Sequence, residues 1–244
     1  MRLIRVHVDA ALAPGARVTL AATATVHLRR VLRLEAGDAV TLFNGDGADY
    51  PSRIAAFGRG TAEAEVTDRV AARAESPLAI TLMQGIARTE RMDLVVQKAT
   101  ELGVAAIVPI ATARGVVRLD AATRARKRAH WQAIAVAACE QCGRARVPAV
   151  AEPRTLDAFL ADPRPDGTRL LLSPDAQVSL GAVAQGAASI ALLVGPEGGL
   201  DDAERLAAIA AGWRACRFGP RVLRSETAAI AAVAVLQSIG GDLG

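Results

Sequence analysis

A glycine-rich loop, GPEGG at residues 195–199, follows an apolar run and precedes a helical pattern that begins with two aspartates. Strand, glycine loop and helix in this order is the usual plan of a phosphate site, where backbone N–H groups and a basic side chain hold the anion. Pro196 removes one donor, Glu197 adds a negative charge, and Asp201 and Asp202 can cap the helix from within. A phosphate site is therefore not expected. A neutral or cationic ligand, such as an adenosine joined to a sulfonium, is compatible with the loop, and a glycine turn without a ligand is the alternative.

A second loop, FGPRVLRSETA, repeats the Gly-Pro step after the next predicted strand. The two loops would face each other if their strands are neighbours in the sheet. Arg221 and Arg224 lie in an apolar neighbourhood, so they need an anionic partner such as a phosphate, a carboxylate or a charged base. A structural ion pair with Glu197 or Glu226 is the alternative. Ser225 is a suitable N-cap for the helix that follows.

The amino-terminal residues, 1–72, are predicted to form short strands separated by turns, in a small antiparallel barrel. The sequence NGDG at residues 44–47 is a strong hairpin signal, and TAEAEVTDRV alternates apolar with charged residues. The basic segment HLRRVLR brings Arg29, Arg30 and Arg33 near one face if it is helical. We interpret that face either as a solvated helix surface or as an edge that contacts RNA.

The remaining residues, 74–244, are predicted to form an α/β domain, because buried strands alternate with helical patterns. RLLLS and SIALLVG are continuously apolar, as in a parallel sheet. TERMDLVVQKATELG has one apolar stripe and ends at Gly103. The closing segment SETAAIAAVAVLQSIG is apolar nearly all round, so we expect it in the core or against another subunit. A long helix that begins near DAATRARKRAHWQ is strongly basic at its start, where Arg124 and Arg128 are either phosphate contacts or part of a solvated face.

The composition is that of a mildly basic globular protein, with a formal net charge of +4. Aromatic residues make up only 3%, which argues against single-strand binding by rows of stacking side chains. The sequence has no apolar run long enough for a membrane span and no signal peptide, so the cytoplasm is the expected location. Cys139 and Cys142 form a C-x-x-C without a second pair, so we expect reduced thiols at a helix surface and no metal site.

Four segments, LLVGPEGGL, FGPRVLRSETAAIAAVAVLQ, QKATELGV and ACEQCGRARVPAV, together closely resemble the RsmE family, and the similarity covers essentially the whole chain. Members of that family methylate N3 of a uridine in 16S ribosomal RNA with S-adenosylmethionine. The resemblance implies an N-terminal PUA-like β-barrel that docks RNA and a C-terminal SPOUT domain whose backbone forms a trefoil knot. It also implies a homodimer without membrane contact, acting on 16S ribosomal RNA in the assembled small subunit.

The resemblance places the cofactor between three loops of the C-terminal domain. It implies cofactor contacts at Leu172, Gly195, Pro196, Glu197, Gly199, Phe218, Gly219 and Leu223. Three positions depart from the family pattern: Phe218 and Ser225 stand where Leu and Thr are expected, and Arg91 stands where Lys is common.

Methylation at N3 requires that the weakly acidic N3 proton be removed or its anion stabilised. We expect Arg221, Arg224 or both to stabilise negative charge on the uracil oxygens. A carboxylate, Glu140 or Glu226, is the candidate proton acceptor. Arg144 is expected to grip the RNA backbone.

Three other functions compete with this interpretation. A non-catalytic RNA-binding protein would lack cofactor affinity, and a related SPOUT enzyme would act on tRNA or on a ribose 2′-hydroxyl. A nucleotide hydrolase is disfavoured, because the sequence has no lysine-containing phosphate loop and no acidic metal site.

Overall fold

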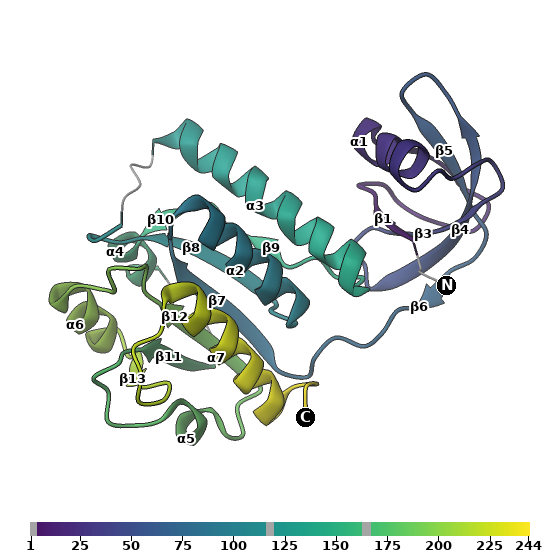
Figure 1. Ribbon diagram of the computed structural model, residues 1–244. Helices are drawn as coiled ribbons and strands as arrows, with labels where there is room; N and C mark the ends of the chain where they lie inside the picture. Colours follow the sequence, from purple (N-terminus) through teal and green to yellow (C-terminus); the bar gives the residue numbers. More distant parts are fainter. Residues whose placement is uncertain (1–3, 116–119, 163–166) are drawn as a thin grey trace. The chain divides into compact units, whose positions relative to one another are not determined.

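The computed structural model describes residues 4–115, 120–162 and 167–244 (Figure 1). By its internal contacts the chain forms two compact units. One comprises the chain through Ala74 together with Cys139–Val147, and the other comprises Glu75–Ala138 and Pro148–Gly244. The segment Cys139–Val147 belongs to the first unit because Cys139 and Ala145 are buried in one cluster with Phe43. The division into domains 1–72 and 74–244 stays a prediction.

The first unit is a curled sheet with one short helical segment. Its elements are β1 (Arg5–His7), β2 (Arg17–Leu20), α1 (Ala22–Val26), the π-helical turn η1 (His27–Val31), β3 (Ala39–Phe43), β4 (Ala48–Phe57), β5 (Ala62–Val66) and β6 (Val70–Ala71). The strands lie in the order β1-β3-β4-β5-β2, and β6 pairs with β4. The expectation of a wholly antiparallel arrangement was wrong for β1, which pairs parallel with β3. Every other pairing of the unit is antiparallel among the described residues.

The predicted hairpin at NGDG is confirmed. Strands β3 and β4 pair antiparallel on either side of residues 44–47, with Leu42 opposite Tyr50. Gly45 and Gly47 both have φ of +90°, a left-handed conformation that glycine adopts without steric cost. Strand β5 alternates buried with exposed residues, and its glutamates face outward as the sequence predicts.

The second unit is built on one parallel sheet. Its elements are β7 (Ala79–Gly85), α2 (Thr89–Glu101), β8 (Ala106–Ala111), α3 (Ala121–Cys142, whose last turn belongs to the first unit), β9 (Ala149–Val150), β10 (Arg154–Thr155), α4 (Leu156–Leu160), β11 (Thr168–Leu172), α5 (Leu180–Ala184), β12 (Ser189–Val194), α6 (Asp202–Ala210), β13 (Arg214–Cys216) and α7 (Ser225–Gly240). This confirms the predicted α/β class.

The strand order is β10-β8-β7-β12-β11-β13, with β9 paired to β8, and all pairings are parallel. The two Gly-Pro loops follow β12 and β13, which are not neighbours because β11 lies between them. The two loops therefore do not follow neighbouring strands, and a third loop, after β11, lies between them at the same edge of the sheet. The trefoil knot does not follow from strand order and stays a prediction.

Two core layers hold the sheet. Helices α2 and α7 pack side by side over β7 and β12 (Figure 1). The predicted stripe of α2 is buried at Met92, Val95, Val96 and Ala99, and Gly103 ends the helix with φ of +85°. A separate cluster joins residues of the sheet to helices α4 and α6 and to Trp213. Helices therefore pack against the sheet near the edge at which β11, β12 and β13 end.

Candidate functional site

A pocket of about 390 Å³ opens where β11, β12 and β13 end. Pockets of this size are typical of small-molecule sites at the carboxyl ends of parallel strands. Its walls come from the three loops after these strands, from the loop after β8 and from the first turns of α6 and α7. The lining residues include Leu171, Leu172, Ser173, Asp175, Val194, Gly195, Pro196, Glu197, Gly198, Gly199, Leu200, Phe218, Arg221, Val222 and Leu223.

The GPEGG loop is folded tightly against the end of β7. Gln84 pairs with Val194 in the sheet, so Gly85 lies beside the start of the loop. A Cβ atom on Gly85 would stand 2.4 Å from the backbone nitrogen of Pro196. Only glycine allows this approach of two backbones.

The amino terminus of α6 is satisfied from within, as the sequence predicts. The Asp201 carboxylate accepts a hydrogen bond from the Glu204 backbone N–H at 2.7 Å, and the Glu204 carboxylate accepts one from the Asp201 N–H at 3.0 Å. This capping box occupies donors that an outside phosphate would need. Glu204 also accepts a hydrogen bond from the backbone of Ala113 at 2.7 Å, which ties the loop after β8 to the pocket.

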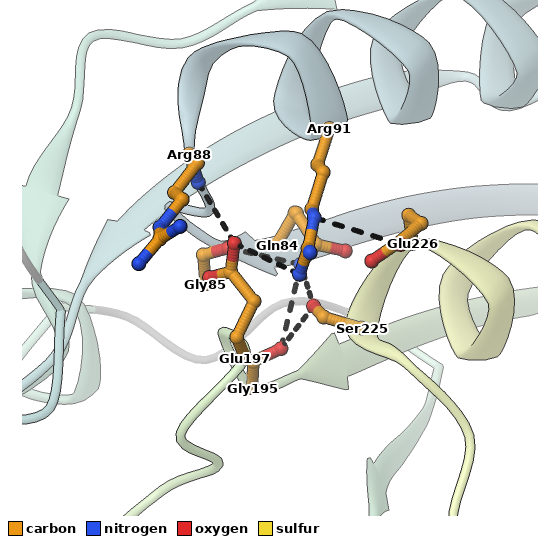
Figure 2. Close-up of polar contacts among 8 residues, drawn as sticks. All are labelled: Gln84, Gly85, Arg88, Arg91, Gly195, Glu197, Ser225 and Glu226. Carbon is orange, nitrogen blue, oxygen red and sulfur yellow. Dashed lines mark hydrogen bonds and ion pairs between the residues drawn. The ribbon is translucent and has the colours of Figure 1, made fainter.

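A buried network joins the GPEGG loop to the start of α7 (Figure 2). The Gln84 side-chain amide donates to the Ser225 hydroxyl at 2.9 Å and to the Gly85 carbonyl at 2.9 Å. The Ser225 hydroxyl in turn donates to the Gly195 carbonyl at 2.6 Å. The prediction that Ser225 caps α7 was wrong, because its hydroxyl is used by Gly195, and Arg224 occupies the N-cap position without a side-chain cap. Gln84 was not predicted from the sequence; it is fully buried in a strand whose other residues are mostly apolar.

A second network, of charged groups, lies beside the first. The Glu197 carboxylate accepts a hydrogen bond from the Arg88 backbone N–H at 3.0 Å and one from the Arg91 guanidinium at 3.5 Å. The Arg91 Nε also lies 3.7 Å from the Glu226 carboxylate. Partial burial favours the neutral form of Glu197, but the Arg88 N–H and the charge of Arg91 outweigh burial, so the pKa of Glu197 lies below its ordinary value. The acids that the sequence analysis offered as ion-pair partners of Arg221 and Arg224 are thus bound to Arg91.

The arginines of the second Gly-Pro loop are exposed. Arg221 lines the pocket together with the highly exposed Val222, whereas Arg224 does not line it. Within the described ranges neither arginine forms an ion pair. Arg114, which the sequence analysis missed, also lines the pocket and donates to the Gly198 carbonyl at 3.0 Å. Arg114 and Arg221 therefore offer guanidinium groups to an anionic ligand or to developing negative charge.

The comparisons with known proteins assign this architecture to a family. The model of an RNA methyltransferase domain matches residues 74–237, and the model of an RNA methyltransferase PUA domain matches residues 26–67. A ribosomal RNA small subunit methyltransferase E from Buchnera aphidicola (subsp. Schizaphis graminum) is 30% identical over 99% of this chain and 98% of its own length. The chain belongs to the RsmE family of RNA methyltransferases.

Two solved structures are similar to this RsmE-family chain over the full length of both chains. One, from Legionella pneumophila, is in complex with the cofactor SAM, with a TM-score of 0.94 and 38% identity. The other is a ribosomal RNA small subunit methyltransferase E from Neisseria gonorrhoeae bound to S-adenosyl methionine, with a TM-score of 0.91 and 36% identity. These likenesses confirm the predicted combination of a PUA-like sheet and a SPOUT-type α/β domain.

The structure brings together most of the residues predicted to contact the cofactor in this RsmE-family chain. Seven of the eight line the pocket, namely Leu172, Gly195, Pro196, Glu197, Gly199, Phe218 and Leu223. Gly219 is not among the lining residues and has φ of +74°, so it shapes the turn between Phe218 and Arg221.

Glu140 and Arg144 lie in the first unit rather than in the unit that holds the pocket. The Glu140 carboxylate accepts a hydrogen bond from the His7 backbone N–H at 3.0 Å. The Arg144 carbonyl accepts one at 3.1 Å from Arg5, whose guanidinium is also paired with Asp49 at 2.7 Å. Within the first unit these contacts fasten the end of α3 and the following loop to β1.

The predicted RNA-contacting arginines fall into two groups. Arg29, Arg30 and Arg33 are all exposed at or just after η1, and Arg33 has φ of +55°. Arg124 and Arg128, at the start of α3, instead contact the β9 segment, through the Glu152 carboxylate at 3.5 Å and the Val150 carbonyl at 3.3 Å. In the first group, the Arg29 guanidinium lies over the Phe57 ring at 5.7 Å from its centroid.

The C-x-x-C motif is not arranged as two surface thiols. Cys139 is buried and donates to the Arg146 carbonyl at 3.6 Å, while Cys142 is half-buried. The expectation of thiols at a helix surface was therefore wrong for Cys139, because the last turn of α3 packs against Phe43. In the described part of the chain no group of His, Cys, Asp and Glu side chains could hold a metal ion, and no helix is long and apolar enough to cross a membrane.

Proposed function

We propose that this protein transfers the methyl group of S-adenosylmethionine to N3 of a specific uridine in 16S ribosomal RNA. The observation that carries the proposal is the full-length likeness to two SAM-bound structures, with a pocket at the ends of β11, β12 and β13. The pocket fits the cofactor, because Leu171, Leu172, Val194 and Leu223 offer apolar walls to an adenine and Asp175 offers an acceptor to ribose hydroxyls. When bound, the cofactor supplies an electrophilic methyl group.

In this proposal Arg221 and Arg224 stabilise the negative charge that develops on the uracil oxygens. A preorganised guanidinium at such a position typically contributes two to three powers of ten to the rate, on the order of 3 kcal/mol. Arg221→Ala is therefore expected to slow methyl transfer about a hundredfold or more while leaving SAM affinity nearly unchanged. Arg217→Ala is the matched control, since Arg217 is exposed just before this loop, does not line the pocket and keeps its backbone hydrogen bonds when truncated.

The proton acceptor is one of two carboxylates. Glu226 is nearly buried beside the pocket-lining Ser225, and its second oxygen has no hydrogen-bond partner among the described residues. Glu140 is held by the His7 backbone in the first unit. Glu226→Gln and Glu140→Gln separate the two candidates. The substitution that removes the general base should slow methyl transfer about a hundredfold or more, and the other substitution should slow it far less.

The first unit is proposed to dock the RNA through Arg29, Arg30 and Arg33. If each of these arginines neutralises a phosphate, RNA binding weakens steeply with salt, and each truncation lowers the slope of log K against log[salt] by about one. The assembled small subunit is the proposed substrate and the cytoplasm the proposed location. A homodimer is proposed because the outer face of α7, including Ile230, Ala231 and Val235, is apolar and only half-buried in one chain.

The decisive experiment combines cells with purified protein. Mass spectrometry of ribosomal RNA from cells lacking the gene should show the loss of one N3-methyluridine, and purified protein with S-adenosylmethionine should restore it on isolated small subunits. An unchanged modification profile, or restoration of a ribose 2′-O-methyl group or of a modified tRNA, would refute the assignment.

A further inference from the structure

Glu197 of the GPEGG loop lines the pocket, so the simplest role of its carboxylate would be that of counter-ion to a cationic ligand. Figure 2 shows that this carboxylate is turned toward the first turn of α2. The same oxygen, Oε1, receives the Arg88 backbone N–H at 3.0 Å and the Arg91 guanidinium at 3.5 Å. Glu197 therefore already has partners of its own in the protein.

Arg91 contacts both segments that border the pocket on this side. Its Nη1 reaches Glu197 in the GPEGG loop, and its Nε reaches Glu226 in the first turn of α7 at 3.7 Å. A guanidinium presents donors along two edges of one plane, so a single arginine can hold two carboxylates in a fixed relation. The side chains are 34%, 26% and 12% exposed for Arg91, Glu197 and Glu226, so water weakens these pairs only in part.

The buried layer beneath connects the same two segments a second time. There Gln84 donates to Ser225, and Ser225 donates to the Gly195 carbonyl. The GPEGG loop and the start of α7 are thus joined inside by neutral groups and outside by Arg91. The arginines proposed to act on the substrate lie immediately before α7, whereas the GPEGG loop forms the wall proposed for the cofactor.

We propose that Glu197 and Arg91 are positioning residues: Arg91 holds the GPEGG loop and the start of α7 in register, and Glu197 serves as its anchor rather than as counter-ion to the cofactor's sulfonium. This inference rests on the proposed function for the identity of the ligand. It deepens that function, because the GPEGG loop would then recognise the cofactor by its shape and not by the charge of the Glu197 carboxylate.

The two roles of Glu197 give different results with two ligands. S-adenosylhomocysteine lacks the methyl group and the positive charge of S-adenosylmethionine but keeps its other groups. A counter-ion contributes only to the charged ligand, whereas an anchor contributes to both. The ratio of the two affinities therefore separates the roles.

The experiment measures the dissociation constants of both ligands by calorimetry for wild type, Glu197→Gln, Arg91→Ala, Arg91→Lys and the control Arg88→Ala. Loss of the charge-assisted contacts is expected to weaken both ligands by the same factor, about three- to tenfold, in Glu197→Gln and Arg91→Ala. Arg91→Lys should recover only part of this loss, because a lysine keeps the charge but lacks the planar guanidinium that spans both carboxylates. Arg88→Ala should weaken both ligands much less than Arg91→Ala, since Arg88 contacts Glu197 through its backbone N–H and its side chain adds only a minor charge interaction. Selective loss of S-adenosylmethionine affinity in Glu197→Gln, or wild-type affinities in Arg91→Ala, would overturn the proposal.

A cofactor-free measurement keeps the inference separate from the proposed function. Amide hydrogen exchange of residues 195–200 in the protein alone should be faster by a similar three- to tenfold in Arg91→Ala and much less affected in Arg88→Ala, which keeps the backbone contact with Glu197. The double variant Arg91→Ala with Glu197→Gln should be faster by less than the product of the two single effects, because both substitutions remove the Arg91–Glu197 contact. Failure of wild type to bind S-adenosylmethionine would refute the proposed function, while unchanged exchange in Arg91→Ala would refute the positioning role of Arg91.

Discussion

Gly85→Ala is expected to damage the pocket by adding a single methyl group. The new Cβ would lie 2.4 Å from the Pro196 nitrogen, 2.5 Å from its Cδ and 2.7 Å from the Gly195 carbonyl carbon, where ordinary contact begins at 3.4 Å. The clash is with backbone, which cannot rotate away as a flexible side chain can. Either the GPEGG loop or the end of β7 must therefore move by about 1 Å.

The size of the effect follows from what that movement breaks. Overpacking of this kind costs about 1–3 kcal/mol, and the Ser225–Gly195 hydrogen bond is lost or stretched as the loop moves. For a unit of this size the change corresponds to a drop in Tm of about 2–12 °C. Since a misplacement of 1 Å can cost about a hundredfold in rate, methyl transfer should fall further than stability does.

The assay is thermal unfolding together with calorimetric titration of S-adenosylmethionine. Gly181→Ala is the matched control, because its added Cβ would meet only the Ile239 Cδ1, at 3.8 Å, and its backbone lies in α5. The control should be neutral or stabilising, since alanine favours a helix over glycine by up to about 1 kcal/mol. Wild-type Tm and wild-type cofactor affinity in Gly85→Ala would refute the reasoning that the two backbones are in contact.

Three further predictions concern other parts of the chain. The pKa of Glu197 is lowered below its ordinary 4.5, so its carboxylate stabilises the fold above that pH, and this contribution is lost as the pH falls through the folded-state pKa. The difference in unfolding free energy between wild type and Glu197→Gln should therefore be constant at neutral pH and vanish in acid. A difference that persisted at pH 2 would contradict this prediction. Burial raises the pKa of Cys216 to about 11 from 9.0, so at pH 8 its thiolate fraction is about a hundredfold below that of an ordinary thiol. Iodoacetamide should therefore label Cys216 only after unfolding, as detected by mass spectrometry. Arg33→Gly should raise stability by about 1 kcal/mol, because φ of +55° strains any residue with a Cβ, and should weaken RNA binding; Arg33→Ala should weaken binding without the gain in Tm.

The sequence predicted the fold well wherever a local pattern decides the structure. The NGDG hairpin, the α2 stripe, the capping of α6 by Asp201 and the bounds of α7 all depend on neighbours within a few residues. Strand order depends on contacts between distant segments, so the position of β11 between β12 and β13 was not accessible from the two Gly-Pro loops alone. For the same reason the parallel pairing of β1 with β3 was missed.

The pocket was predicted through its glycines, and its polar supports were not. Gln84 gave no signal because a single glutamine in an apolar strand is compatible with many environments. Ser225 gave a misleading signal, since a serine at the start of a helix is a favoured N-cap residue and was therefore expected to cap α7. Glu197 was correctly marked as the unusual residue of its loop, yet its partners Arg88 and Arg91 lie more than a hundred residues away in the sequence.

The segment Cys139–Val147 makes the first unit discontinuous in the gene. A fragment ending at Ala74 would lack Cys139 and Ala145, which cover the fully buried Phe43, and would leave the Arg5 guanidinium without the Arg144 carbonyl. The two units therefore cannot be separated by one cut, nor exchanged between proteins by one recombination event. A laboratory chimaera that exchanges the first unit must therefore transplant both pieces together.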